Sequence, residues 1–199
     1  MITTRYYRVA RHVIALTADE DIFALIDNCR PFEVAPSEPL IEMKIRIEEY
    51  DDSVRVLRDE EPIHKANIKT LPYPGFPTDM QPLAVMLLTI AEGTSTVRED
   101  VWESRFQYVD QLRRMGANIK VNGKTAVIEG VKQLMGCAVR STDLRAGAAM
   151  LIAGLIAKGT TELYNLTHID RGYENFESKL RMLGADITRI NDVEDVVLC

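Results

Sequence analysis

Five charged side chains have types and spacings that suit catalysis or anion binding. Asp79 follows a loop rich in proline and glycine, which holds the next side chain in a defined direction. Asp143 and Arg145 stand together at the start of a long apolar stretch, and Arg105 and Arg171 lie 66 residues apart in matching surroundings. A positioned carboxylate can take a proton, and a guanidinium group binds phosphate or carboxylate through paired hydrogen bonds. These residues are therefore candidates for a site that handles an anionic substrate.

The same five residues also have structural interpretations. Asp79 and Asp143 stand where helix N-caps belong, and from local sequence a cap is favoured for Asp79 over a catalytic base. Arg145 falls in a first helical turn, where its charge opposes the helix dipole, so anion binding is one reason for its presence. Arg105 and Arg171 fit ion pairing and anion binding equally well. Local sequence leaves both interpretations open for the two arginines.

Three further residues are weaker candidates. His168 lies near a helix start, where a single histidine is more often structural than catalytic. Trp102 belongs either to the core or to the wall of a pocket. Cys137 lies between two small residues, so small apolar packing is its expected role.

Composition and missing motifs exclude several classes of function. The chain has 199 residues and a formal net charge of -6, so a general nucleic-acid binder with a basic surface is not expected. The longest apolar stretch, residues 146–157, is shorter than the roughly 20 residues that span a bilayer, and we recognise no secretory signal. Walker, GxGxxG and HExxH sequences are absent. Three cysteines without a CxxC pair predict neither a zinc site nor a disulfide framework, and they favour the cytoplasm.

An internal repeat organises most of the chain. Four landmarks recur in the same order, with an offset that grows from 64 to 68 residues: a Thr-Asp pair, an Ala-x-Gly-Thr sequence, an arginine and a Gly-Ala pair. We interpret this as two copies of one supersecondary unit, at residues 68–133 and 134–199.

Each copy predicts the order βαβαββ. The first helix, residues 78–92 or 144–158, is apolar nearly all round and therefore buried, with Gly93 and Gly159 expected at C′. A strand follows at 94–99 or 160–166, and then an amphipathic second helix. A further strand begins near residue 118 or 186. In the first copy it forms a hairpin through Asn122-Gly123.

Residues 1–46 do not follow the repeat clearly, and we leave them as a divergent, unassigned N-terminal segment. Prolines interrupt them, and residues 21–29 predict one short helix. Residues 47–56 are typical of a hairpin that closes an earlier copy of the unit.

The landmark sequences resemble those of one family. PYPGFPTDMQ (72–81), AEGTSTVREDVWESRF (91–106), STDLRAGAAMLIAGLIAKGTT (141–161) and HIDRGYENFESKLRMLGA (168–185) are similar to blocks of the UDP-N-acetylglucosamine 1-carboxyvinyltransferases. These are the enolpyruvyl transferases of peptidoglycan synthesis. The resemblance implies an α/β fold, an inverted α/β barrel of two domains built from βαβαββ units. Family members are about twice as long, and residues 47–199 resemble the C-terminal domain.

The resemblance also implies roles for single residues. Asp79 matches the aspartate that contacts the sugar 3′-hydroxyl and is proposed as general base. Val101 and Arg105 match the loop that contacts the nucleotide sugar, where many members have phenylalanine in place of Trp102. No metal and no organic cofactor is implied.

The remaining matches concern phosphate. Asp143, Leu144 and Arg145 match the family's closure and phosphate-handling segment, and Arg171 matches the second arginine that grips phosphoenolpyruvate. The resemblance thus implies transfer of the enolpyruvyl group of phosphoenolpyruvate to the 3′-hydroxyl of UDP-N-acetylglucosamine, with release of phosphate. That reaction is the first committed step of peptidoglycan synthesis and serves cell-wall biogenesis, cell shape and cell division.

The family's general acid, on a mobile loop, belongs to the domain that has no counterpart in this sequence. The chain by itself is therefore expected to be catalytically incomplete, with the N-terminal domain or a companion chain as partner. One alternative is a non-catalytic half-domain that binds the nucleotide sugar or completes a partner. A lesser alternative is the shikimate-phosphate enolpyruvyl transferase. No nucleic-acid or membrane partner is expected.

Overall fold

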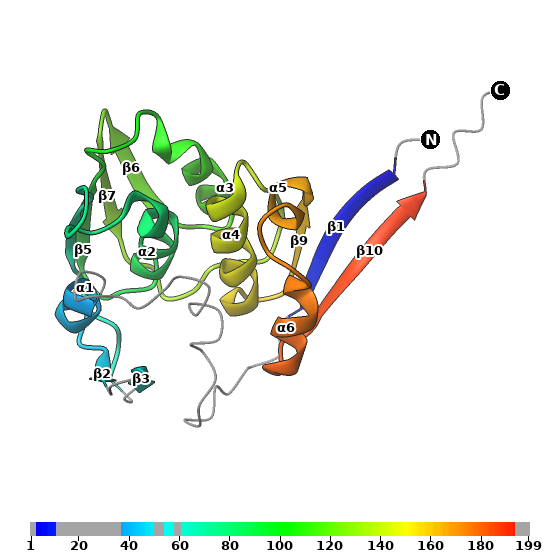
Figure 1. The fold of residues 1–199 in the computed structure, drawn as a ribbon, viewed down its shortest axis with the longest axis horizontal. Coiled ribbons are helices and arrows are strands. Elements are labelled where there is room, and N and C mark those ends of the chain that lie inside the picture. The colour runs from blue at the N-terminus through cyan, green and yellow to red at the C-terminus, as the bar shows by residue number, and fades with distance from the viewer. Residues whose placement is uncertain (1–2, 11–36, 50–53, 58–60, 194–199) are drawn as a thin grey trace. The chain divides into compact units, whose positions relative to one another are not determined.

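The computed structural model describes residues 3–10, 37–49, 54–57 and 61–193 (Figure 1). Their elements follow in chain order. They are β1 (Thr3–Ala10), α1 (Ser37–Glu42), β2 (Arg46–Glu49), β3 (Val54–Leu57), β4 (Asn67–Lys69), the 3-10 helix η2 (Thr78–Met80), α2 (Gln81–Leu88), β5 (Thr94–Arg98), the 3-10 helix η3 (Arg105–Tyr108), α3 (Val109–Arg114), β6 (Asn118–Asn122), β7 (Thr125–Glu129), β8 (Ala138–Arg140), α4 (Leu144–Ile156), β9 (Thr160–Tyr164), α5 (Thr167–Asp170), α6 (Phe176–Met182) and β10 (Ile187–Val193).

The chain divides into two compact units. The first-repeat unit comprises the described residues within Ala15–Phe106 and Ala117–Lys132. The second-repeat unit comprises those within Met1–Ile14, Gln107–Gly116 and Gln133–Cys199. Helix α3 therefore belongs to the second-repeat unit, where it contacts α4 and β8.

The first-repeat unit contains a complete four-stranded sheet, in the order β4-β5-β7-β6. Strands β4 and β5 are parallel, and α2 provides the crossover that parallel neighbours require. Strands β6 and β7 form the hairpin predicted through Asn122-Gly123, with Gly123 at a φ of 58°. The inward residues of this sheet are fully buried, among them Val97, Ala126 and Ile128.

The second-repeat unit contains a matching sheet, in the order β8-β9-β1-β10. Strands β8 and β9 are parallel, and β10 takes the place of β6. Strand β1, from the N-terminal segment, pairs antiparallel with both β9 and β10 and occupies the place of β7. Residues 3–10, which the sequence pattern leaves unassigned, thus contribute a central strand to this sheet.

The register of β1 matches that of β7. In the first-repeat unit Ile128 stands opposite Ser95 on one side and Ile119 on the other. In the second-repeat unit Val9 stands opposite the repeat-equivalent residues Thr161 and Ile187. The sheet therefore receives its fourth strand at the same alignment, although the strand comes from a distant part of the chain.

Most predicted elements are confirmed, with shorter bounds. The hairpin expected at residues 47–56 is formed by β2 and β3, which pair antiparallel. The second helices are broken, into η3 and α3 in one repeat and into α5 and α6 in the other. Gly93 and Gly159 have positive φ angles of 98° and 93°, but both lie beyond C′ of the preceding helix, so that detail was wrong. The helix expected at residues 21–29 lies outside the described residues.

Helix α4 forms the centre of the second-repeat unit. Eight of its residues are buried, and it contacts β8, β9, β1 and α5. Within this helix Gly147 allows the closest approach, because a Cβ there would clash with Ser141 Oγ and would lie 2.8 Å from Ile169 Cγ1. Among the residues that the structure describes, no helix combines the length and apolar character needed to cross a bilayer.

The double pairing of β1 predicts that proline inside it disrupts the second-repeat sheet. In Tyr7→Pro we expect backbone amides of β9 and β10 to exchange with deuterium at least about tenfold faster, because a central strand cannot lose an N–H without breaking its ladder. Tyr7→Thr keeps the N–H and strand propensity and serves as control. Hydrogen exchange by mass spectrometry measures both, with the β6–β7 hairpin as internal reference. Unchanged exchange in Tyr7→Pro would contradict the pairing.

Candidate functional site

Every candidate site residue follows the carboxyl end of a parallel strand. In the first-repeat unit Asp79 lies on the segment after β4, and Val101 and Arg105 lie on the segment after β5. In the second-repeat unit residues 143–145 follow β8, and Arg171 follows β9. Ligands of open α/β sheets bind outside these carboxyl ends. The topology therefore presents the candidates at the edge where binding is expected.

Asp79 is not a helix N-cap, so that interpretation was wrong. The helical turn begins earlier, with Pro77 as the extended N-cap of η2, and Met80 is the N-cap of α2. Neither cap makes a side-chain hydrogen bond, and Pro82, in the first turn of α2, has no N–H to satisfy. The Asp79 carboxylate is thus left for a different contact.

That contact is an ion pair with Arg105. Arg105 Nη2 donates to Asp79 Oδ1 at 3.2 Å. The arginine side chain is only 10% exposed, whereas that of Asp79 is 58% exposed. Such a pair contributes at most about 1 kcal/mol to stability, so its main effect is to orient the carboxylate. The Nε of Arg105 is buried and has no hydrogen-bond partner in the described part of the chain.

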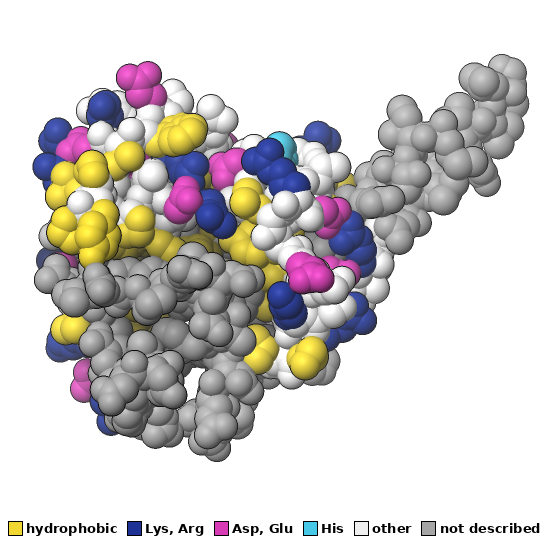
Figure 2. All heavy atoms as spheres, viewed as in Figure 1, with side chains coloured by type: hydrophobic (Ala, Val, Ile, Leu, Met, Phe, Trp, Pro, Cys, Tyr) yellow, Lys and Arg dark blue, Asp and Glu magenta, His cyan; other side chains and the backbone are white. Residues whose placement is uncertain are grey.

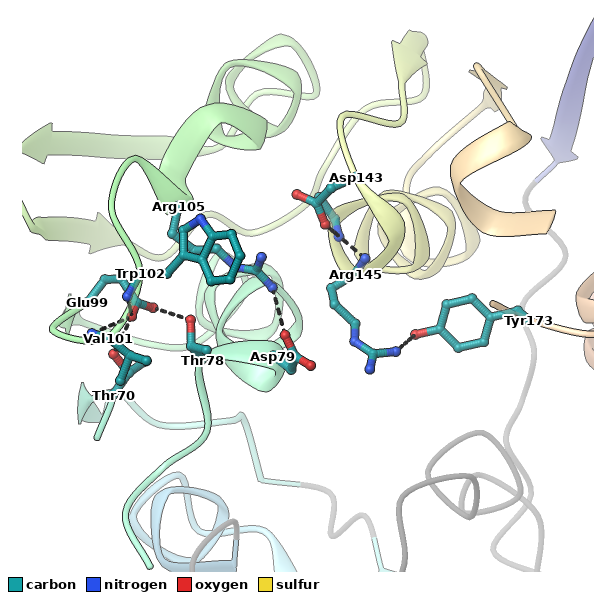
Figure 3. A network of polar contacts seen from close by, with 11 residues as sticks. Thr70, Thr78, Asp79, Glu99, Val101, Trp102, Arg105, Asp143, Arg145 and Tyr173 are labelled. Carbon is teal, nitrogen blue, oxygen red and sulfur yellow. Dashed lines mark hydrogen bonds and ion pairs between the residues drawn. The ribbon is translucent and has the colours of Figure 1, made fainter. Parts of the chain in front are cut away.

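The loop that carries Val101 and Arg105 is held by Glu99, a residue that the sequence analysis missed. Glu99 is 1% exposed, and its Oε1 accepts the backbone N–H groups of Val101 and Trp102, both at 2.9 Å (Figure 3). A signal was present, because Ser95, Val97 and Glu99 alternate along one buried face of the strand and its end. A charged residue on the buried side of such an alternation marks an unusual environment.

Trp102 is not part of the core. Its side chain is 59% exposed, and the guanidinium carbon of Arg105 lies 5.8 Å from its ring centroid. This distance suits a cation–π contact. Together with the Asp79 pair, it fixes the Arg105 guanidinium on two sides within the first-repeat unit (Figure 3).

The N-cap predicted for Asp143 is confirmed. Asp143 is extended, and its Oδ1 accepts the backbone N–H groups of Arg145 and Ala146, both at 2.9 Å. Arg145 follows in the first turn of α4, and its Nη1 donates to the hydroxyl of Tyr173 at 3.4 Å. Tyr173, whose ring stacks on Phe176, therefore connects the start of α4 with the segment after β9.

Leu144 lies on the segment after β8 and Arg171 on the segment after β9, which are the two segments that Tyr173 connects. A Cβ on Gly172 would lie 2.7 Å from a Leu144 methyl carbon, so Leu144 packs directly on this glycine. Arg171, the C-cap of α5, is exposed and directly precedes Gly172 in the chain. The second-repeat unit thus brings together the segments of Arg145 and Arg171 through Tyr173 and Gly172. Neither of these connecting residues was predicted from the sequence as a site residue.

His168 and Cys137 show no arrangement suited to catalysis. His168 is half-buried in α5. Burial raises the pKa of the Cys137 thiol, and the nearby charge of Arg114 only partly opposes this effect. A thiol with a raised pKa is a weak nucleophile at neutral pH. Packing remains the better account of the cysteine.

Apolar side chains are exposed on the loops of the first-repeat site. Leu71 and Tyr73 lie on the loop between β4 and η2, and Val101 and Trp102 on the loop after β5. All four are more than 40% exposed. Figure 2 shows hydrophobic side chains gathered over the elements of this unit, with charges of both signs between them. Such surface often marks a binding or packing face.

Comparisons with known proteins agree with the resemblance that the landmark sequences indicate. The family model of EPSP synthase (3-phosphoshikimate 1-carboxyvinyltransferase) matches residues 25–180. The chain is 58% identical over 151 residues to a UDP-N-acetylglucosamine 1-carboxyvinyltransferase of Clostridium botulinum, which covers 76% of this chain and 36% of that protein. A second relative of the same name, from Caldanaerobacter subterraneus, is 54% identical over 153 residues, or 77% and 36% of the two chains. The chain thus spans about a third of the length of these relatives.

Solved structures give the same fold. The enolpyruvyl transferase NikO from Streptomyces tendae is 31% identical, with a TM-score of 0.72 over 79% of this chain and 36% of that chain. An EPSP synthase from Acinetobacter baumannii shares the fold at 17% identity, with a TM-score of 0.51 over 85% and 47% of the two chains. The predicted fold class, α/β with repeated βαβαββ units of the enolpyruvyl-transferase type, is confirmed.

The cap at α4 predicts a measurable loss of stability when its acceptor is removed. Asp143→Ala leaves two backbone N–H groups without their partner and costs about 1 kcal/mol, or roughly 2–4 °C in melting temperature for a chain of this size. Asp143→Asn keeps an acceptor and loses less. Glu174→Ala, an exposed change in the same unit, is the control. Equal melting temperatures for Asp143→Ala and Glu174→Ala in calorimetry would contradict the cap.

Proposed function

Because the chain belongs to the EPSP synthase family of enolpyruvyl transferases, we propose that it is part of a UDP-N-acetylglucosamine 1-carboxyvinyltransferase. In this proposal the protein transfers the enolpyruvyl group of phosphoenolpyruvate to the 3′-hydroxyl of UDP-N-acetylglucosamine. Inorganic phosphate is released. Relatives with 54% and 58% identity carry that name, which favours this acceptor over others in the family.

One observation carries the proposal: Asp79 presents an exposed carboxylate that Arg105 holds in position at 3.2 Å. The loop before η2 closes on itself through hydrogen bonds from Leu71 N to Phe76 O and from Gly75 N to Pro72 O. A carboxylate on such a support can accept a hydrogen bond from a sugar hydroxyl and take its proton. Asp79 is therefore proposed as the general base, with Val101 and Arg105 at the nucleotide sugar.

The proposed chemistry has two steps. In the first, the 3′-oxygen bonds to C2 of phosphoenolpyruvate, its proton passes to Asp79, and a general acid protonates C3. In the second, the tetrahedral adduct loses phosphate and a proton from C3, which restores the double bond in the enolpyruvyl ether. Arg145 and Arg171 suit the phosphate and carboxylate of phosphoenolpyruvate, because guanidinium groups bind both in paired geometry. Asp143 caps the helix that carries Arg145, and Leu144 packs beside it. The reaction as proposed uses no metal and no organic cofactor.

The general acid is proposed to come from outside these 199 residues. The chain spans about a third of the relatives' length, so the groups carried by the remaining two thirds have no counterpart here. We propose that the rest of the enzyme, on an N-terminal domain or on a companion chain, covers the first-repeat loops. The exposed side chains of Leu71, Tyr73, Val101 and Trp102 support this, since a packing partner would bury them.

The proposed setting is the cytoplasm, in the first committed step of peptidoglycan synthesis. The three cysteines form no CxxC pair, which suits a reducing compartment. Two alternatives remain as outcomes of the test below. One is a half-domain that binds the nucleotide sugar without catalysis. The other is transfer to shikimate 3-phosphate, which is disfavoured by the names of the relatives at 54% and 58% identity.

The proposal predicts that Asp79 contributes to binding of the acceptor sugar. In Asp79→Ala we expect the dissociation constant of UDP-N-acetylglucosamine to rise about 10–100-fold, because a hydrogen bond to a charged group is worth about 1.5–3 kcal/mol. Isothermal titration calorimetry on the chain measures this. The matched control is Asp110→Ala, which removes another exposed aspartate paired with an arginine, Arg113, at 2.7 Å. The control should bind like the unchanged chain.

Two further measurements separate the alternatives. Preference for shikimate 3-phosphate over UDP-N-acetylglucosamine in the same titration would replace the proposed acceptor. Phosphate release from phosphoenolpyruvate is then measured after the rest of the enzyme, proposed above as an N-terminal domain or a companion chain, is supplied as a second chain. Acceptor binding without any phosphate release in that mixture would favour the non-catalytic half-domain.

A further inference from the structure

Glu99 is a buried carboxylate that accepts four hydrogen bonds, all from neutral donors. Its Oε1 accepts from Thr70 Oγ1 at 2.7 Å and from the backbone N–H groups of Val101 and Trp102 at 2.9 Å each. Its Oε2 accepts from Thr78 Oγ1 at 3.0 Å (Figure 3). No ion pair with Glu99 is found among the described residues. A buried charge without a counter-ion is tolerated only when hydrogen bonds satisfy it, and here four do so.

These four bonds join three segments of the first-repeat unit. Thr70 directly follows β4, Thr78 opens the turn that carries Asp79, and Val101 and Trp102 begin the loop that carries Arg105. Thr70 Oγ1 also accepts the N–H of Asp100 at 3.0 Å, which adds a third bond to the same loop. One side chain thus connects both segments that meet in the Asp79–Arg105 ion pair.

The connections form a closed circuit. From Glu99 the path runs through Thr78 to its neighbour Asp79, then across the ion pair to Arg105. It returns through the loop to Trp102, whose N–H bonds Glu99 and whose ring lies 5.8 Å from the Arg105 guanidinium carbon. Two segments tied at both ends of a circuit have little freedom to move relative to each other.

The second-repeat unit shows that the fold does not require a carboxylate at this junction. There Ser141 is the equivalent of Thr70, because its N–H bonds Tyr164 O as the N–H of Thr70 bonds Arg98 O. Asn165 is the equivalent of Glu99, and it joins the same two strand ends with one bond, from Nδ2 to Ser141 O at 2.9 Å. Asn165 is exposed and neutral. A buried charge at the same place in the first-repeat unit therefore does more than join the strands.

We propose that Glu99 is a positioning residue of the acceptor site, the site of Asp79, Val101 and Arg105 at which UDP-N-acetylglucosamine is proposed to bind. Glu99 holds the loop of Val101 and Arg105 in place against the turn of Asp79. This inference rests on the proposed function for what the site binds, but not for the positioning itself. Glu99 acts through its neighbours and touches no reacting atom. The side chain suits this role because its Oε1 accepts from both backbone N–H groups of the loop, while Oε2 accepts from Thr78 Oγ1.

The first test measures positioning without any ligand. In Glu99→Ala we expect the amides of Val101 and Trp102 to exchange with deuterium at least about tenfold faster, whereas Glu99→Gln, which keeps Oε1, should stay within about threefold. The matched control is Ser95→Ala. Ser95 is equally buried on β5, the strand that Glu99 directly follows, and its Oγ accepts the N–H of Ala66 at 3.2 Å, a residue outside the loop. Equal exchange in Glu99→Ala and the unchanged chain would overturn the proposal.

The second test measures binding of UDP-N-acetylglucosamine. Glu99→Ala should raise the dissociation constant about tenfold or more, and Glu99→Gln and Ser95→Ala should leave it within about threefold, even if Ser95→Ala lowers the melting temperature as much. Should Glu99→Ala not fold, Thr78→Val replaces it, because it removes only the bond between Glu99 and the Asp79 turn. An equal loss of affinity in Ser95→Ala would reduce Glu99 to a structural role and overturn the proposal.

Failure of the proposed function is distinguishable from failure of this inference. If the unchanged chain does not bind UDP-N-acetylglucosamine, the proposed acceptor is wrong. The exchange rates of Val101 and Trp102 still decide whether Glu99 positions the loop. Trp102 is the single tryptophan of the chain, so its fluorescence gives an independent signal of the same loop.

Discussion

Parallel pairing of two strands in each unit is the constraint on which the rest of the structure depends. Strands β4 and β5, and likewise β8 and β9, run side by side in one direction, so their carboxyl ends meet at one edge. Such pairs need a crossover, and the buried helices α2 and α4 supply it. The segments after the four strand ends carry all the candidate residues. The chemistry of each unit is therefore gathered by topology, and loop sequence only selects the side chains.

Completion of each sheet is the second requirement, and the two units meet it differently. In the first-repeat unit β7 follows β6 through a tight turn, so the closing strand is local. In the second-repeat unit β1 enters between β9 and β10 at the register of β7. The two closing strands pair with their neighbours in matching register. A strand needs only the right alternation and alignment to fill such a position, and it does not need to be near in sequence.

The two strand junctions differ in whether they use a charged side chain. In the second-repeat unit an exposed, neutral Asn165 is sufficient to join Ser141 to the end of β9. In the first-repeat unit the buried Glu99 holds two loops, and the nearly buried Arg105 holds the exposed carboxylate of Asp79. Neither charge is well explained as a source of stability, because burial opposes both. They are better explained as groups that define where Asp79 points.

The sequence by itself determined the repeat, the order of helices and strands, the buried helix α4 and the cap at Asp143. These depend on hydrophobic periodicity and on contacts within one helical turn, which neighbouring residues decide. Only the tertiary structure decided that Asp79 pairs with Arg105, 26 residues away, instead of capping a helix, that Glu99 is buried among Thr70 and Thr78, and that residues 3–10 complete a distant sheet. The physical reason is that a side chain or strand edge takes the best partner available in space, and that partner is known only after the chain has folded.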